Sequence, residues 1–138
     1  MGDAAGTVNL LAVFLAALSA FVLGGLWYSP LMFFKVWKAA AKLSDEDLKA
    51  RDARAPIVFG GAFVLALIGA FVFAMFLGPS PAMGFAVGAG ASAGLCWVAG
   101  SFGINYLFET RSLTLFLING GYHTVQFTLY GVILSYFG

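Results

Sequence analysis

The segment NYLFETRSLTLFLINGGYH, residues 105–123, contains the end of one apolar run, a turn with two charged residues and the start of a second apolar run. It also holds His123, the only histidine of the chain, and two of its three asparagines. Both flanking runs are long enough to cross a bilayer as helices, so the turn predicts a helical hairpin. A histidine inside such a run costs free energy unless it has a partner, which makes it the place to look for a functional site.

The composition predicts a membrane protein. The chain has 138 residues, of which 62% are hydrophobic and 9% are charged, whereas a soluble domain carries about 25% charged residues. Four apolar runs cover approximately residues 7–28, 57–77, 82–108 and 113–137, and each has the roughly 20 residues that a spanning helix needs. We therefore expect an all-α integral membrane bundle of four transmembrane helices in one domain, residues 1–138. The third run is longer than needed and should tilt, kink or protrude.

The charged residues indicate an orientation. Six of the seven Lys and Arg residues lie within 29–56, and Arg111 lies in the turn 109–112. By the positive-inside rule, both segments are expected in the cytoplasm and both termini on the other side. The residues before the first run include Asp3 and no Lys or Arg, which is not the pattern of a cleaved signal peptide.

The linker between the first and second runs, residues 31–55, begins with an amphipathic segment. At helical spacing, the lysines of 31–43 share one face and apolar side chains the other, as in a helix lying among lipid headgroups. We interpret it as a cytoplasmic anchoring linker rather than a lipid sensor. Ser44 and the acids after it predict a short helix that Pro56 should end near Ala55. The residues expected to face the headgroups are Lys35, Trp37, Lys38 and Lys42.

Small residues recur at four-residue spacing inside the runs, which lets helix backbones approach one another closely in lipid. These ridges are more numerous than the packing of one copy requires, so we expect a homo-oligomer. The residues expected to pack at interfaces are Gly84, Gly88, Gly100, Gly120, Gly121, Thr124 and Thr128.

The last run carries a stripe of polar side chains. Four of them, at i, i+4, i+7 and i+11, fall within about 60° on a helical wheel. This flank cannot face lipid, because unsatisfied amide and imidazole groups are costly there. Two interpretations remain open: a site or ladder that binds a solute or relays protons, and hydrogen bonds that hold helices together. The candidate residues are His123, Asn119, Gln126, Tyr122, Tyr130, Asn105, Glu109 and Arg111, the last two also explicable by topology alone.

Other chemistry is poorly supported by the residue inventory. One His and one Cys cannot form a zinc site within one chain. We find no pairing of a nucleophile with a base, so an enzyme is the less favoured class and no metal or cofactor is expected. Acidic residues are interleaved with the basic segment, which argues against a nucleic-acid partner.

Three blocks carry a resemblance to a known family: GLWYSPL at 25–31, LFETRSL at 107–113 and LINGGYH at 117–123. Together they resemble the small bacterial membrane proteins grouped as domain-of-unknown-function family 1761. The resemblance implies a protein of the bacterial inner membrane with four helices and no assigned activity. It also implies that Asn119 stands where an acidic residue is often expected, which argues against a simple proton–carboxylate mechanism.

Three functions are therefore considered. The first is an oligomeric transporter or channel for a small solute or ion, with His123 at its polar site. The second is an accessory or scaffold protein that docks a partner through its small-residue faces. The third is a redox protein whose histidine holds a haem or a quinone headgroup, where bis-histidine haem would need two chains. The polar stripe lines a pore if several copies turn the last helix inward, and forms an internal core if it packs on the third helix.

Overall fold

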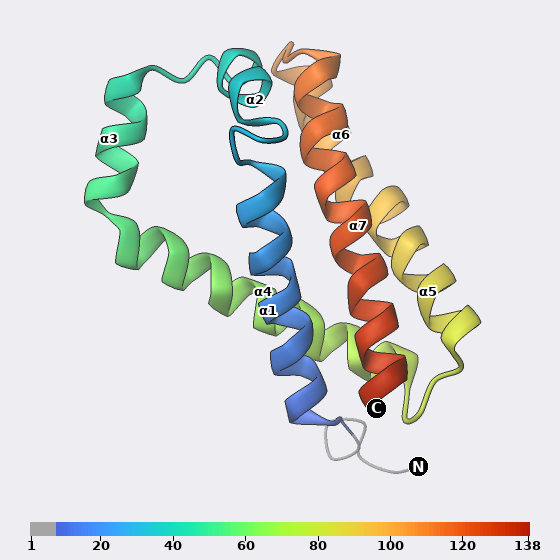
Figure 1. The fold of residues 1–138 in the computed structure, drawn as a ribbon. Helices are drawn as coiled ribbons and strands as arrows, with labels where there is room; N and C mark the ends of the chain where they lie inside the picture. Colours follow the sequence, from blue (N-terminus) through green and yellow to red (C-terminus); the bar gives the residue numbers. More distant parts are fainter. Residues whose placement is uncertain (1–7) are drawn as a thin grey trace.

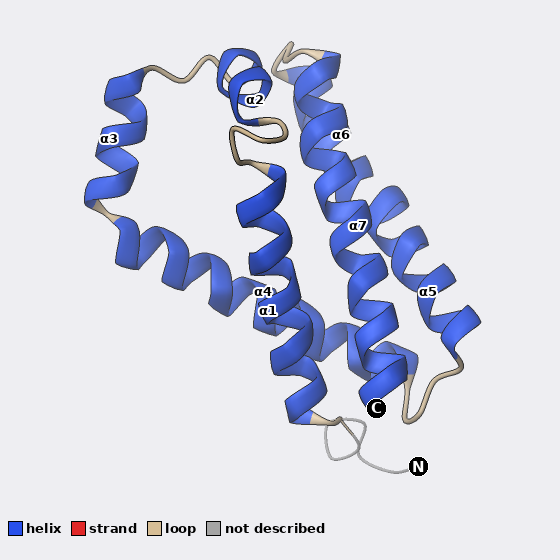
Figure 2. Cartoon of the chain, viewed as in Figure 1, coloured by secondary structure: helices blue, strands red, loops and turns tan. Residues whose placement is uncertain are grey.

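The computed structural model describes residues 8–138, and the regular structure of this part is entirely helical (Figures 1 and 2). The all-α prediction is therefore confirmed for these residues. In chain order the elements are α1 (Leu10–Trp27), α2 (Phe34–Ala40), α3 (Asp45–Ala53), α4 (Ala55–Leu77), α5 (Met83–Ser92), the π-helix η2 (Ala93–Ala99), α6 (Gly100–Phe108) and α7 (Leu113–Phe137).

Three of the helices described are long and apolar enough to cross a membrane. They are α1, α4 and the continuous helix Met83–Phe108, which is formed by α5, η2 and α6. Helix α7 has 25 residues but is outside this set. Its polar stripe lowers its mean hydropathy, although its bounds coincide with the predicted run 113–137.

Helix α7 is the centre of the bundle. It lies between α1 on one side and the α5–η2–α6 helix on the other, and α4 crosses behind α1 at a steep angle (Figure 1). The contact with α5 and η2 is close because glycines occupy it. A Cβ at Gly90 would lie 2.1 Å from the carbonyl oxygen of Phe127, and one at Gly94 would lie 2.5 Å from that of His123. The backbones themselves are in contact there, which fixes the depth and rotation of α7.

The long third run contains a π-helical segment, Ala93–Ala99, in its middle. A π-helix takes more residues per turn than an α-helix, so it changes which side chains share a face on either side of it. Gly94 of this segment packs on α7, whereas Cys96 and Trp97 are exposed on the opposite side. This π-helical segment was not predicted, and the expectation that the run tilts, kinks or protrudes stays a prediction.

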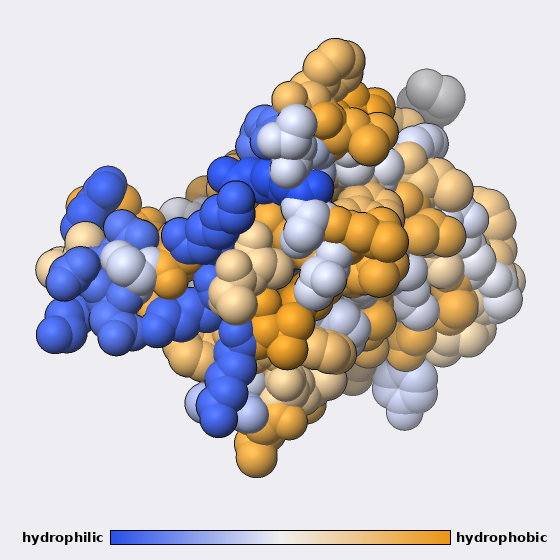
Figure 3. Space-filling view, turned by 90° about the horizontal axis from the view of Figure 1, so that it is seen from above, coloured by the Kyte–Doolittle hydropathy of each residue, from blue (hydrophilic) through white to orange (hydrophobic). Residues whose placement is uncertain are grey.

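The linker forms two short helices that extend from one end of the bundle, where Figure 3 shows most hydrophilic side chains gathered. The amphipathic helix is shorter than the predicted 31–43, since α2 covers Phe34–Ala40 and Lys42 adopts a left-handed φ of 57°. Lys35 and Lys42 are exposed, but the ring of Trp37 packs edge-on against Tyr28 at 5.5 Å between centroids. The linker is therefore attached to α1 by aromatic contact.

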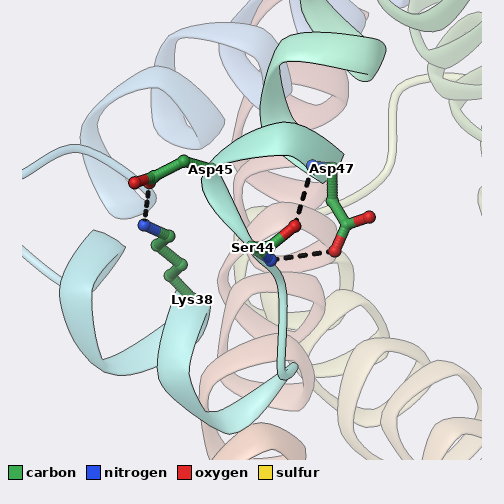
Figure 4. A network of polar contacts seen from close by, with 4 residues as sticks. All are labelled: Lys38, Ser44, Asp45 and Asp47. Carbon is green, nitrogen blue, oxygen red and sulfur yellow. Dashed lines mark hydrogen bonds and ion pairs between the residues drawn. The ribbon is translucent and has the colours of Figure 1, made fainter.

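Helix α3 begins at the predicted residue. The Ser44 hydroxyl accepts a hydrogen bond from the Asp47 N–H (3.0 Å), and the Ser44 N–H donates to the Asp47 carboxylate (2.8 Å) (Figure 4). Hydrogen bonding of the Asp47 carboxylate to Ser44, by the backbone N–H most of all and then by the side chain, holds the pKa of this carboxyl below its ordinary value. Lys38 pairs with Asp45 beside this cap. As expected, the helix ends just before Pro56, which then lies in the first turn of α4.

Two glycines on opposite faces of α5 allow the central contact to be tested. We expect Gly90→Ala to destabilise the fold by about 1–3 kcal/mol, because the new methyl group would overlap the backbone of α7. Gly88→Ala should be neutral or stabilising by up to about 1 kcal/mol, since nothing lies within 4 Å of its Cβ position and alanine favours helix. Unfolding by dodecyl sulfate in mixed micelles, followed by far-UV circular dichroism, measures both. Equal effects of the two substitutions would contradict the close contact.

Candidate functional site

The polar side chains of α7 form two separate hydrogen-bonded networks. In the first, the Tyr28 hydroxyl donates to Oδ1 of Asn119 (2.7 Å), and Nδ2 of Asn119 donates to the Tyr106 hydroxyl (2.8 Å). Beside it, the Trp27 indole N–H donates to the Ile118 carbonyl at 3.0 Å. The amide uses its acceptor on one side and its donor on the other, so this network joins α1, α7 and α6.

The second network begins at His123. Its Nδ1 lies 2.6 Å from Oε1 of Gln126, and Nε2 of Gln126 donates to the Tyr130 hydroxyl at 2.8 Å. That hydroxyl donates in turn to the carbonyl oxygen of Ala66 on α4, at 3.0 Å. Gln126 is 8% exposed and Tyr130 is fully buried. The polar flank is thus turned towards protein, as the sequence predicted, and it connects α7 to α4.

The imidazole of His123 is held by aromatic rings but is not closed in. The Phe102 ring stacks on it at 5.1 Å between centroids and an interplanar angle of 11°, and Tyr122 meets it edge-on at 4.9 Å. The Tyr122 hydroxyl is fixed by donating to the Ala20 carbonyl at 2.9 Å. Within residues 8–138, Nε2 of the histidine has no hydrogen-bond partner, yet this part of the chain contains no enclosed side-chain nitrogen or oxygen without one. Nε2 is therefore not fully enclosed by protein atoms.

The remaining candidates lie outside both networks. Asn105 is exposed on α6, and Glu109 forms an exposed ion pair with Arg111 at 2.9 Å in the turn before α7. The structure brings together His123, Gln126 and Tyr130, and it places Asn119 apart from them with two tyrosines. One continuous ladder from Glu109 to Tyr130 is consequently not formed. For the buried part of the stripe, the geometry is that of an internal core and not of a pore lining between copies.

Most of the small residues predicted at interfaces are used inside the chain. Gly120 faces Ala99, and Gly121 faces the Trp27 ring, where added Cβ atoms would lie 3.1 Å away in each case. The hydroxyls of Thr124 and Thr128 donate to carbonyls one turn earlier in α7. A Cβ on Gly100 would meet only the Leu95 carbonyl oxygen, at 3.9 Å, and Gly84 and Gly88 face open space.

Sequence reasoning missed the partners that complete the site. Tyr28 and Tyr106, whose hydroxyls bond to Asn119, were not among the candidate residues. Phe102 gave no signal, since phenylalanine is common throughout these runs. The Ala66 carbonyl could not have been found, because a backbone group carries no residue-type signal.

The chemical capacity of the site is limited. Among the residues described, no group of three or more His, Cys, Asp or Glu side chains could hold a metal ion. No Asp, Glu, Lys or Arg lies within α1, α4, Met83–Phe108 or α7. What remains is one imidazole nitrogen that can receive a hydrogen bond or a proton, with aromatic rings around it.

Fold and site together define a helical protein with three potential membrane-crossing helices and an uncharged polar centre built on one histidine. The chain belongs to the family described as "Protein of unknown function (DUF1761)", whose model matches residues 11–135. The resemblance seen in the sequence is thereby confirmed. No curated protein and no solved structure matches the chain.

Tyr130→Phe tests the buried network. It removes the only partner of the Gln126 amide N–H, so we expect a loss of about 1 kcal/mol in the free energy of unfolding. Tyr136→Phe, on the same helix but 76% exposed, should change it by less than about 0.5 kcal/mol. Dodecyl sulfate unfolding in mixed micelles compares the two. A Tyr130→Phe protein as stable as the wild type would show that the network contributes nothing measurable.

Proposed function

We propose that the protein crosses the membrane four times, with α7 as the fourth span. Two observations support this. The turn 109–112 joins α7 directly to Met83–Phe108, and the two helices pack side by side with their backbones in contact. At 1.5 Å per residue, 25 residues extend about 37 Å, which exceeds the hydrocarbon thickness of roughly 30 Å. The length of α7 and its antiparallel packing on a candidate spanning helix support a place for it in the bilayer.

The proposed orientation places α2, α3 and the turn 109–112 in the cytoplasm and both termini on the other side of the inner membrane of a bacterium. The distribution of Lys and Arg supports it, since all of them lie at the end of the bundle that carries the linker. In this orientation, α2 lies at the level of the headgroups, with Lys35 and Lys42 exposed to them and Trp37 on the protein.

We propose that the bundle moves a small solute or ion across the membrane, with His123 as the group that contacts it. The observation that carries this proposal is the open Nε2. Among residues 8–138, every other side-chain nitrogen and oxygen that forms the two networks has at least one hydrogen bond, whereas this nitrogen has none. His123 lies ten residues into α7, about 15 Å along the helix and near the middle of the bilayer in the proposed topology. An ionisable side chain at that depth is by default a functional one.

Two substitutions at one position test the transport proposal. His123→Asn keeps a polar group near the place of Nδ1, within reach of Gln126, and removes Nε2. His123→Gln places its amide near Nε2 and gives up the bond to Gln126. We expect His123→Asn to lower flux roughly tenfold, as loss of one solute hydrogen bond would, and His123→Gln to retain more of it.

The measurement uses proteoliposomes, with pyranine reporting protons and light scattering reporting glycerol. Protein-free liposomes provide the baseline, and Tyr136→Phe is the control for reconstitution. Flux that both His123 variants leave unchanged would contradict the assignment. If His123→Asn is active and His123→Gln inactive, the histidine has only the structural role of holding Gln126.

A second candidate function is assembly, with a second copy of this chain as the partner. Ser92, Ser101 and Asn105 are exposed on Met83–Phe108, and among residues 8–138 their side chains have no hydrogen-bond partner. Ser101 is about two helical turns, or about 12 Å, from Glu109 along the helix, so in the proposed topology it would lie in the hydrocarbon layer. An amide and a hydroxyl each donate and accept, so the same residues of another copy can satisfy them across a twofold axis.

Cys96, the only cysteine and exposed on this face, reports the assembly directly. In native membranes we expect copper phenanthroline to cross-link it into a dimer, and Asn105→Leu with Ser101→Leu to reduce the dimer severalfold, because about 0.6–2 kcal/mol is lost per bond. As a matched control, a thiol moved to the exposed position 10 of α1 (Cys96→Ser with Leu10→Cys) should not cross-link. Equal cross-linking from both positions would contradict a specific interface.

A further inference from the structure

Each hydrogen bond of the His123 network has a defined donor and acceptor. The Ala66 carbonyl, at the end of the network away from His123, determines them. The Ala66 carbonyl can only accept, so the single hydroxyl proton of Tyr130 points to it. The hydroxyl oxygen must then accept from Gln126, which turns the amide nitrogen towards it and leaves Oε1 facing the imidazole. An amide oxygen can only accept. The proton between Gln126 and His123 therefore belongs to Nδ1.

A neutral imidazole carries one N–H, so the lone pair is on Nε2. We infer that His123 is held as the Nδ1–H tautomer and that its Nε2 is an acceptor selective for neutral hydrogen-bond donors, the hydroxyl of an alcohol or phenol. This inference rests on the proposed function and names the class of solute that the site takes. A molecule that offers only acceptors, such as an ether or a quinone carbonyl, finds no donor on the neutral ring.

The requirement for a neutral ligand comes from the charge distribution. No Asp, Glu, Lys or Arg side chain lies within the four long helices, and Glu109 and Arg111 neutralise each other in the exposed turn. An ion bound at Nε2 would have no counter-charge, which is costly in a poorly solvated site. Phe102 and Tyr122 offer apolar and aromatic surface to the body of the ligand instead.

The same order of donors and acceptors prevents the network from conducting protons. If Nε2 takes up a proton, Nδ1 keeps its own and continues to donate to Gln126. The amide cannot pass a proton from its oxygen to its nitrogen without forming an imidic acid. A proton that enters at Nε2 must leave from Nε2, so the buried stripe orients the histidine and does not conduct.

The single histidine makes the test direct, because ¹⁵N-histidine labelling gives one imidazole spectrum. The protein is purified in detergent micelles through a tag without histidine. We expect Nδ1 to show a directly bound proton and Nε2 the shift of an unprotonated nitrogen. Gln126→Leu removes the acceptor and should shift the population towards Nε2–H. Tyr130→Phe is the milder second variant, which frees the amide to flip and should give a mixture of tautomers.

Phenol and anisole then test the ligand class, since the two differ by one methyl group on the donor oxygen. Phenol should shift the Nε2 resonance in a saturable way, and anisole at equal concentration should not. A proton on Nε2 in the wild type, or equal responses to phenol and anisole, would overturn the inference. If either occurs while His123→Asn still lowers flux, the ligand class is wrong and the transport proposal stands. If the spectra are as expected and His123→Asn leaves the flux unchanged, the transport proposal alone fails.

Discussion

A polar group enclosed in an apolar helical bundle must find its partner inside the protein, and this requirement organises the molecule around α7. The helix carries an amide at 119, whose partners lie outside α7, and another at 126, whose partners His123 and Tyr130 lie on α7 itself. Asn119 reaches tyrosines on α1 and α6, and Gln126 reaches α4 through Tyr130. All three neighbouring helices are thus tied to α7 by hydrogen bonds that are strong where water is scarce. These bonds act in addition to the glycine contacts that fix the depth and rotation of α7 against α5 and η2.

Glycine and hydrogen bonding act together in this arrangement. Gly90 and Gly94 bring the backbone of the third long helix against that of α7, which sets the depth at which Phe102 lies. From that depth the ring covers one face of His123. The π-helical turn lets one helix make both the glycine contact with α7 and the Phe102 contact with His123, because it changes the rotation of the helix between these two contacts. The aromatic environment of the histidine is therefore a consequence of how closely two backbones approach one another.

The sequence predicts the helices well and their partners poorly, and the reason is physical. The length of an apolar run determines a helix almost alone, so 113–137 was found without error and the other runs within three residues. Spacing within one helix also gives the polar flank of α7, because side chains at i, i+4 and i+7 share a face in any surroundings. Which groups meet that flank depends on the crossing of other helices. The roles of Tyr28 and Phe102 and the carbonyl of Ala66 follow only from the packed structure.

Asn119 and His123 are one turn apart, yet the structure gives them different tasks. Asn119 accepts a hydrogen bond from one tyrosine hydroxyl and donates one to another. An amide bonded in this way connects two helices and has fewer free hydrogen-bonding positions for a ligand. The resemblance implied an acidic residue at this position, and a carboxylate could accept from both tyrosines but would bring a charge. With the neutral amide, the polar centre has no fixed charge, and among residues 8–138 Nε2 of His123 is the side-chain nitrogen of the two networks that has no hydrogen bond. In the proposed site, recognition of a solute would then depend on the direction of hydrogen bonds and not on charge.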